Sequence, residues 1–461
     1  LLLAGGRLPP APAGRAAAAQ ELELAEAEPT TMLQQGAATC SRLGESCDGS
    51  GCCTGRGVLC YSPGCRGGVA IGGATCRAWE EPGESRWMRR PEQKRPHTTW
   101  KAHGVTCHSR FVVPPMPLDA TEYNGIDLAP TCFNGSGPHT VFVIANWGGI
   151  VAGDRGNRGS GRTHIAPADH TAFGANPREF VKEADEWAQF EVALHMQKRA
   201  GETKPDYVLN GGDSFHWGGI EAHCGMPPSQ YADTGQWKHI FEQMYIGPGI
   251  DGKQWLGVLG NQDYGGWTYL SAWDQTIGYT WGGPESTGRW TMPAQYWKAP
   301  VYYEDFAVEY YFVDTNYLTA GPRAKASDGD VCNGRKAAAS RSQSCGPQGP
   351  ISARDCPGWF GRLWEGQKLW LDRELARSKS QWQIVVTHFP PTWGREEWQA
   401  LARKHGVDLI VAGHERRLEV HVPEDPLSML EGQPGLYSDF MGGTGWIVAG
   451  GGGGITSEGT P

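Results

Sequence analysis

The chain from about residue 138 onward alternates short apolar runs with stretches of helical periodicity. Residues 141–145 are apolar and rich in β-branched side chains, which is typical of a strand buried on both faces. Further strands are predicted at 207–209, 255–259, 307–313, 383–386 and 407–411. Helices are predicted at 364–378 and 396–404, and another is expected to end at Gly201. This last helix is predicted from apolar residues at helical spacing: Phe180, Ala184, Trp187, Ala188 and Val192.

Strands that alternate with helices predict a layered α/β domain over residues 138–461. One stretch, residues 319–359, interrupts the alternation and contains Cys332, Cys345 and Cys356. We therefore expect it to be an insertion that disulfides hold in place.

The residues before this domain differ in texture. Residues 1–38 are rich in Ala, Pro and Glu, which predicts a disordered leader or the remnant of a signal peptide. Seven of the 13 cysteines lie between Cys40 and Cys76, in a Gly-rich stretch with few apolar residues. Because no hydrophobic core can hold such a stretch, a disulfide-rich module is expected over 39–80, with spacing that resembles the knottin type. A zinc site is the alternative, although the stretch has no CxxC pair. Residues 81–137 are expected to be a linker and lead-in segment.

Charge and cysteine content narrow the function classes. The net charge is −9 and no long run of Lys or Arg is present, which argues against nucleic acid as a partner. The clustered cysteines predict an oxidising compartment, and hence a secreted or secretory-pathway protein. No stretch approaches the roughly 18 apolar residues that a membrane span requires.

Five polar motifs each follow a predicted strand. They are Asn146-Trp147-Gly148-Gly149, Gly212-Asp213-Ser214-Phe215-His216, Gly260-Asn261-Gln262-Asp263, Thr387-His388-Phe389-Pro390 and Gly413-His414-Glu415-Arg416. Each motif alone is far more common as an ordinary turn than as part of a site. Ligands collect at the carboxyl ends of strands in open α/β sheets, so the five together favour one shared site.

In this order the motifs resemble those of calcineurin-like metallophosphoesterases, most closely the small, tartrate-resistant type of purple acid phosphatase. The family pattern has Asp in the first motif, then Gly-Asp-x-x-Tyr, Gly-Asn-His, His, and Gly-His-x-His. The resemblance implies a β-sandwich flanked by helices and two metal ions that clamp a phosphate and generate a hydroxide. In the family the chain continues past a glycine run like residues 450–454, so we also expect this sequence to be truncated at its C-terminus.

The resemblance implies that one of the two metal sites is kept. Asp213 matches the carboxylate that bridges the two metals. Asn261, His388 and His414 match the remaining ligands of the second metal, and their oxygen and nitrogen donors suit Zn, Mn or Fe. One divalent metal is therefore expected.

The other metal site differs from the family pattern at three positions. Asn146 stands for the Asp, His216 for the Tyr and Arg416 for the last His. Together these changes make the pocket three charge units more positive, and a guanidinium about 4 Å from a cation costs on the order of 4 kcal/mol per unit charge at an effective dielectric constant of about 20. Since Arg also cannot become a ligand, we expect the first metal to be lost.

The acid–base group of the family is also replaced. Gln262 stands where the family has a His, and an amide can hydrogen-bond a phosphate oxygen but cannot transfer a proton near neutral pH. A rebuilt metal site, using His216 with Asp154, His164, His170 or His223, is the alternative to a lost one.

Three functional hypotheses follow. The first is a divergent phosphomonoesterase in which Gln262, Arg416 and His216 act on the substrate. The second is an inactive, secreted pseudo-phosphatase that binds phosphate or a partner through the old cleft. In the third, the cysteine-rich module tethers the protein to a surface or matrix partner.

Overall fold

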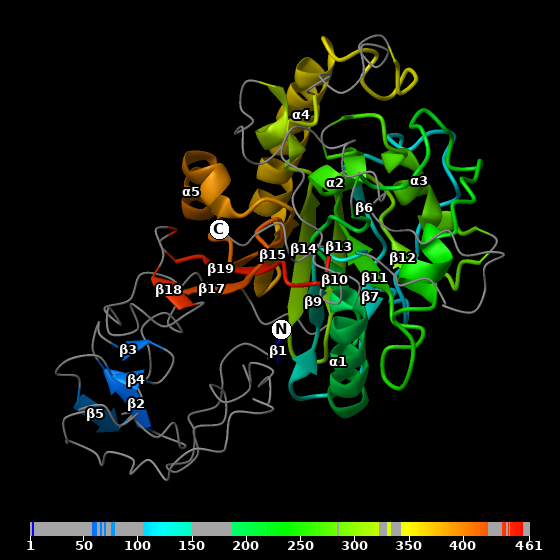
Figure 1. Ribbon diagram of the computed structural model, residues 1–461. Coiled ribbons are helices and arrows are strands. Elements are labelled where there is room, and N and C mark those ends of the chain that lie inside the picture. The colour runs from blue at the N-terminus through cyan, green and yellow to red at the C-terminus, as the bar shows by residue number, and fades with distance from the viewer. Residues whose placement is uncertain are drawn as a thin grey trace. The chain divides into compact units, whose positions relative to one another are not determined.

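The computed structural model describes residues 105–149, 187–216, 218–266, 268–283, 285–321, 330–332, 343–422, 441 and 443–454, together with a few strands elsewhere (Figure 1). The chain divides into two compact units. The first comprises Leu1–Leu8, Gln93–Glu424 and Gly435–Pro461, and the second comprises Pro9–Glu92 and Asp425–Pro434. In the second unit β2 (Val58–Tyr61) pairs with β5 (Thr75–Ala78), and β3 (Cys65–Arg66) with β4 (Val69–Ala70). The disulfides expected in the cysteine-rich module lie outside the described residues.

The smaller sheet of the first unit is parallel. Its order is β12 (Trp290–Thr291), β11 (Trp255–Gly257), β10 (Val208–Asn210) and β9 (Phe142–Ile144). The apolar runs at 141–145, 207–209 and 255–259 therefore form strands, as predicted. Every residue of β10 and β11 is buried, which agrees with the rule that parallel strands are covered on both faces.

The larger sheet is mixed. Its order is β18 (Leu436–Ser438), β17 (Leu418–Val422), β19 (Gly445–Ala449), β16 (Leu409–Ala412), β15 (Trp382–Thr387), β14 (Ala307–Val313), β13 (Trp297–Tyr302) and β6 (Ile126–Asp127). The strands from β14 through β15 and β16 to β19 run parallel, whereas β13 is antiparallel to β14. A further strand, β7 (Thr131–Cys132), also pairs with β13, so the lead-in segment contributes two strands to this sheet. Outside both sheets, β1 (Leu2–Leu3) pairs with β8 (His139–Thr140).

Alternating side chains show that the two sheets face each other. Leu209 of the small sheet belongs to the same buried cluster as Tyr310, Phe312 and Val386 of the large sheet. Their neighbour Tyr311 points the other way, into a second cluster that includes helix residues. Successive residues of a strand point to opposite faces, so the first cluster is the filling of a sandwich and the second lies under the helices.

Three long helices flank the sheets: α1 (Ala188–Thr203), α4 (Cys356–Arg377) and α5 (Arg395–His405). Helix α5 agrees with its prediction, and its acidic first turn and basic last turn suit the helix dipole. The predicted end of α1 at Gly201 is wrong. The helix continues to Thr203 because Lys204 takes the left-handed conformation that usually falls to glycine, and its N–H donates to the Ala200 carbonyl. Shorter helical segments are η4 (Trp237–Glu242), α2 (Asn261–Tyr264), α3 (Trp273–Gly278), η5 (Tyr279–Trp281), η6 (Asn316–Thr319) and η10 (Pro391–Trp393).

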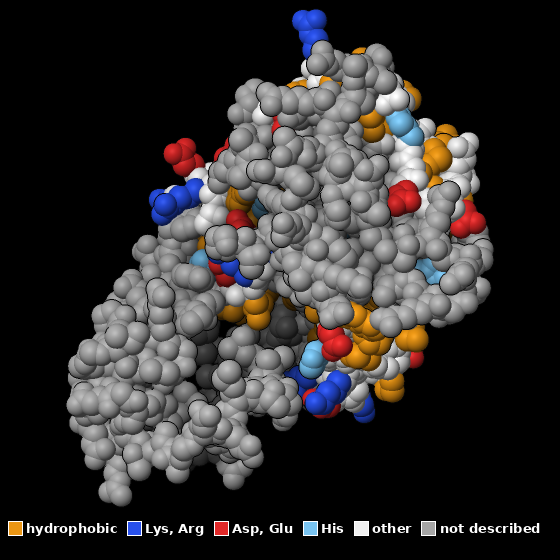
Figure 2. Space-filling view, viewed as in Figure 1, with side chains coloured by type: hydrophobic (Ala, Val, Ile, Leu, Met, Phe, Trp, Pro, Cys, Tyr) orange, Lys and Arg blue, Asp and Glu red, His pale blue; other side chains and the backbone are white. Residues whose placement is uncertain are grey.

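One face of α1 is apolar and partly exposed. Ala193 and Ala200 are buried, whereas Phe190 and Leu194 are about two-fifths exposed and Trp187 packs edge-on against Phe190. In Figure 2, hydrophobic side chains gather at the lower part of the view, in the area where Figure 1 places α1. The inner side of this helix is thus formed by Ala193, Ala200 and the hydrogen-bonded Gln189, while Phe190 and Leu194 lie at the surface.

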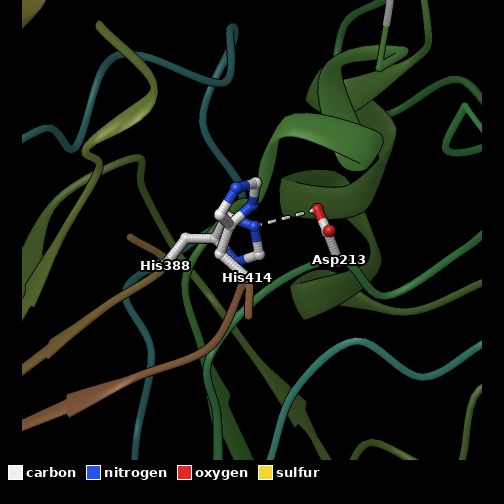
Figure 3. Close-up of side chains that lie close together, drawn as sticks. All are labelled: Asp213, His388 and His414. Atoms are coloured by element: carbon white, nitrogen blue, oxygen red, sulfur yellow. Dashed lines mark ion pairs between the residues drawn. The ribbon is translucent and has the colours of Figure 1, made fainter. Parts of the chain in front are cut away.

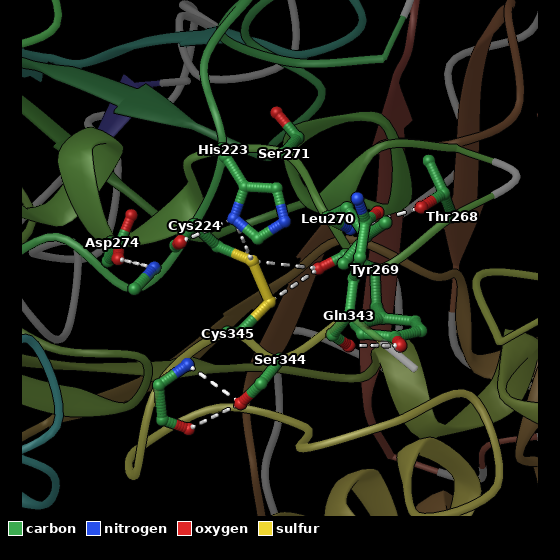
Figure 4. The surroundings of a disulfide bond; sticks show 12 residues. His223, Cys224, Thr268, Tyr269, Leu270, Ser271, Asp274, Gln343, Ser344 and Cys345 are labelled. Carbon is green, nitrogen blue, oxygen red and sulfur yellow. Dashed lines mark hydrogen bonds between the residues drawn. A yellow bond between two sulfur atoms is a disulfide. The ribbon is translucent and has the colours of Figure 1, made fainter. Parts of the chain in front are cut away.

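Disulfides fix the insertion, as predicted. Cys332 is bonded to Cys356 at the start of α4, and Cys345 is bonded to Cys224 in the loop that follows β10 (Figure 4). A third disulfide joins Cys107 to Cys132. Helix α4 begins earlier than predicted because its first turn contains Pro357, whose fixed φ suits a helix start, and because Cys356 is anchored. The disulfides point to an oxidising environment. Among the described residues, no helix is long and apolar enough to cross a membrane.

A buried ion pair supports the wall beside the small sheet. The Arg289 guanidinium lies 3.0 Å from a Glu242 carboxylate oxygen, and both side chains are at most 6% exposed. Arg289 also donates to the Phe241 and Tyr245 carbonyls, and Glu242 accepts from Tyr279 Oη. Both charges are therefore fully hydrogen-bonded, which a buried pair requires.

Removing one partner of this pair should be costly. We expect Glu242→Ala to lower the free energy of unfolding by about 3–5 kcal/mol, because Arg289 would remain buried without a counter-charge. The matched control is Glu285→Ala, which breaks the half-exposed pair with Lys238 and should cost at most about 1 kcal/mol. Urea denaturation measures both. Equal losses of unfolding free energy in the two variants would contradict a larger contribution from the buried pair.

Candidate metal centre

The five polar motifs meet at one end of the sandwich. Asn146, Asp213 and Asn261 follow β9, β10 and β11 of the small sheet, whereas His388 and His414 follow β15 and β16 of the large sheet. The ligand atoms of Asp213, His388 and His414 all lie within 4.8 Å of one another. Figure 3 shows the two imidazole rings side by side, with the Asp213 carboxylate facing them. Residues up to 201 positions apart in the sequence thus form one cluster because both sheets end here.

The backbone at this cluster is unusual. Asn146, Asp213 and His414 have φ values of 54°, 56° and 64°, and the only other non-glycine residue with positive φ in the described part of the chain is Lys204. The left-handed region costs an L-residue roughly 1–2 kcal/mol. Such strain persists where the surroundings over-determine it, and it concentrates at functional sites.

The spacing of the ligand atoms fits one divalent ion. Asn261 Oδ1 lies 3.1 Å from His388 Nε2 and 3.1 Å from His414 Nδ1, and His388 Nε2 lies 3.3 Å from Asp213 Oδ1. Ligands bound at about 2.0–2.2 Å to one ion lie about 3.0–3.5 Å apart in tetrahedral or octahedral geometry. The Nδ1–H of His388 donates to the Gly211 carbonyl at 2.7 Å, which leaves its Nε2 lone pair directed at the centre. These four residues could therefore hold a metal.

Electrostatics keep the central carboxylate ionised. Burial opposes the charge on Asp213, but His388, His216 and His414 hold the pKa of this carboxyl well below its usual range. For His388 the balance is the reverse: burial lowers its pKa, and the Asp213 carboxylate more than offsets this and raises it. Without a metal, the neighbouring imidazoles stabilise the buried Asp213 carboxylate, and a bound cation would take over this role.

Asp263 belongs to the third motif, but the motif comparison gave it no role in this centre. Its carboxylate accepts three backbone N–H groups, from Asp213 and Gly260 on one oxygen and from Ser214 on the other, at 2.8–2.9 Å. Burial, followed by repulsion from Asp213, raises the pKa of Asp263 to about 7. It ties the second motif to the third and holds Asp213 in its left-handed turn. The signal in the sequence was its place three residues after Gly260, where a capping box puts an acidic side chain.

The positions expected to have lost the first metal are also beside Asp213. The Asn146 amide nitrogen lies 3.3 Å from Asp213 Oδ2 and 3.1 Å from the His414 carbonyl oxygen. His216 is buried, with Nδ1 donating to the Trp147 carbonyl at 2.7 Å and Nε2 lying 3.7 Å from Asp213 Oδ2. In this orientation the Asn146 amide presents its nitrogen, not its oxygen, to the Asp213 oxygen that a first metal would need, so Asn146 does not fit a cation at that oxygen.

Two other predicted residues have different surroundings. Gln262 donates from its backbone N–H to Asp213 Oδ1 at 2.8 Å, while its side-chain Oε1 accepts from Gly218 N–H, which leaves Nε2 as the group it could offer a ligand. Arg416 is half-buried in the loop after β16, where Gly450 packs against its backbone. Of the residues considered for a rebuilt site, Asp154, His164 and His170 lie outside the described residues. His223 bonds to the Cys224 carbonyl beside the disulfide and not to the ligands (Figure 4).

The glycine run at residues 450–454 packs directly against the centre. Gly454 donates its N–H to the Asn146 carbonyl at 2.8 Å, and a Cβ at this position would lie 2.8 Å from His216 Nδ1 and 2.5 Å from the Asn146 carbonyl oxygen. Only glycine lets the chain pass this close.

Comparison with known proteins identifies the family. The model of the calcineurin-like phosphoesterase family matches residues 163–417, more than half of the chain. The chain therefore belongs to the calcineurin-like phosphoesterase family, and the resemblance stated from its motifs is confirmed. No curated protein matches the chain in sequence.

Among the solved structures that match this chain is GAP50, described as the anchor in the inner membrane complex of Plasmodium. It is 16% identical with a TM-score of 0.40, over 68% of this chain and 71% of that one. Another is a purple acid phosphatase from yellow lupin (Lupinus luteus) seeds, which is 15% identical with a TM-score of 0.33. That match covers 70% of this chain and 46% of the lupin chain, so this chain spans less than half of the lupin enzyme's length.

The role of Asp263 can be separated from that of an ordinary buried carboxylate. We expect Asp263→Asn to lower the free energy of unfolding by about 1–3 kcal/mol, since an amide cannot accept all three N–H groups, and also to weaken metal binding. Asp274 is the matched control because it too is buried and accepts three backbone N–H groups, but from Gly225, Met226 and Gln275, none of which belongs to the centre. Asp274→Asn should cost similar stability and leave metal affinity, measured by calorimetric titration, unchanged. Loss of metal affinity in both variants would contradict a specific role for Asp263.

Proposed function

We propose that this chain binds phosphate monoesters at a single divalent ion and lacks the two-metal hydrolysis of its family. The proposal rests on the different surroundings of the two oxygens of the Asp213 carboxylate. Asp213 Oδ1 lies 3.3 Å from a ligand histidine, whereas Oδ2 accepts a hydrogen bond from the Asn146 amide. One side of Asp213 therefore suits a cation and the other side does not.

The same residues define what the chain would contribute. Asp213, Asn261, His388 and His414 would hold the ion, which supplies a Lewis-acidic charge for a phosphate oxygen when bound. Arg416 follows His414 by two residues and could add a second positive group, since a guanidinium pairs with phosphate in bidentate fashion. The Gln262 Nε2 group would donate a further hydrogen bond. The disulfides support a secreted or secretory-pathway location for this activity.

We expect no efficient turnover, because Gln262 stands at the position where the family has an acid–base His. Gln262 cannot transfer a proton, and its carbonyl oxygen is engaged by Gly218 N–H. A phosphate bound here would be neutralised and oriented without a group to protonate the leaving alcohol. Binding without efficient hydrolysis is the expected result.

One-metal hydrolysis is the second candidate, and His216 is the observation that favours it. Its buried ring has Nδ1 fixed by the Trp147 carbonyl and Nε2 on the side of Asp213, which is the orientation of a residue that could exchange a proton or bind a water. In this candidate, turnover of a phosphate monoester would depend on both His216 and His388.

Calorimetric titration with Mn²⁺ and then with inorganic phosphate tests the proposal. We expect wild-type protein to bind one ion and then phosphate. His388→Ala should lose both, and Arg416→Glu should lose phosphate affinity while keeping the ion, because it reverses a charge outside the ligand set. The control is His405→Ala, which removes a buried ring at the end of α5 that pairs with Asp372 of α4, and it should leave both titrations unchanged.

Hydrolysis is measured in parallel with p-nitrophenyl phosphate. Turnover that persists in His388→Ala would place the activity elsewhere. Turnover that His216→Ala and His388→Ala both abolish would favour one-metal hydrolysis over binding alone. No phosphate binding to the metal-loaded wild type would overturn the proposal.

A further inference from the structure

The Asn146 side chain joins two parts of the centre that come from different sheets. Its amide nitrogen donates to Asp213 Oδ2 at 3.3 Å and to the His414 carbonyl at 3.1 Å, and the residue is 1% exposed. Asp213 follows the small sheet and His414 follows the large one. Both amide hydrogens are thus used, each on an acceptor of a residue proposed to hold the metal.

These two acceptors need a positive or donating group between them. A carboxylate at position 146 would place three oxygen acceptors together in a buried space, which is unfavourable without a cation. An amide of the same shape turns one of the three into a donor. An Asn whose amide nitrogen points at both acceptors therefore satisfies them without a cation.

The backbone of Asn146 is held independently of its side chain. Its N–H donates to the Gly212 carbonyl at 3.0 Å and its carbonyl accepts from Gly454 N–H at 2.8 Å. The φ of 54° lies in the left-handed region, which Asn tolerates and which costs glycine nothing. Glycine at 146 would therefore remove the amide while preserving the backbone, so the function of the amide can be tested by itself.

We propose that Asn146 is a positioning residue whose amide takes the place of the first metal and holds Asp213 and His414 in the geometry that binds the remaining ion. This inference rests on the proposed single-ion centre and deepens it. Groups that orient metal ligands through hydrogen bonds typically change metal affinity by 10- to 100-fold when removed.

The first experiment titrates metal-free, full-length protein with Mn²⁺ by calorimetry. Wild type and Asn146→Gly should each bind one ion per chain, with affinity about 10- to 100-fold weaker in the variant. Lys204→Gly is the matched control, because Lys204 has a φ of 48° at the end of α1 and glycine relaxes it in the same way. Its metal affinity should equal that of wild type. Two ions in wild type and one in Asn146→Gly would make Asn146 a ligand and overturn the inference, as would an unchanged affinity.

The second experiment needs no bound metal. In EDTA, Asn146→Asp should unfold at a lower temperature than Asn146→Gly, because it adds a charged acceptor beside Asp213 and the His414 carbonyl. An Asn146→Asp protein as stable as wild type would overturn the inference. If wild type bound no metal at all, the single-ion centre would fail, while the order of the three unfolding temperatures would still decide whether the amide joins the two loops.

Discussion

The candidate centre depends on the Asp213 carboxylate, which is held in a strained backbone turn between two sheets. Its backbone N–H is fixed by Asp263, and its two oxygens face different partners, His388 and the Gln262 N–H on one side and the Asn146 amide on the other. A buried carboxylate stays ionised only when such partners surround it. The fold supplies them because the strands of both sheets end at the same edge of the sandwich.

In the proposed single-ion centre, this arrangement explains how one metal site would persist while the other is lost. The two sites share only Asp213, and their other residues lie on opposite sides of it. Asn261 Oδ1 lies within hydrogen-bond distance of both His388 and His414. Replacing any one of these three residues would therefore remove a contact from another. On the other side, Asn146 satisfies Asp213 and the His414 carbonyl without a cation. Substitution there therefore leaves no unpaired charge, which is the usual cost of dismantling a buried ionic site.

Much of the fold, and the clustering of Asp213, Asn261, His388 and His414, could be predicted from the sequence because both depend on local patterns. Apolar runs predicted β9, β10, β11, β15 and β16, and the motif after each one predicted which side chains meet. Strand β13 was missed because Pro300 lies in its middle, which normally argues against a strand. In the structure β6 pairs with residues 297–298 and β7 with 301–302, so Pro300 falls in the gap between the two partners.

Other features depend on long-range contacts, which sequence spacing does not contain. The contacts of Asn146 with Asp213 and with His414 join positions 67 and 268 residues apart. The lead-in segment forms strands because β6 and β7 pair with β13, which is distant in the sequence. The end of α1 is likewise set by the left-handed conformation of Lys204, which its residue type does not predict. The family resemblance implies that the first metal's ligands are replaced, but only the structure shows the Asn146 amide in hydrogen-bond contact with Asp213.

The most direct measurement is anomalous X-ray diffraction from crystals of the protein grown with excess Mn²⁺ or Zn²⁺. The account predicts one anomalous peak at this centre, bounded by Asp213, Asn261, His388 and His414, with the Asn146 amide still bonded to Asp213. Two peaks about 3.5–4 Å apart on either side of Asp213, the arrangement of a two-metal site, would contradict it.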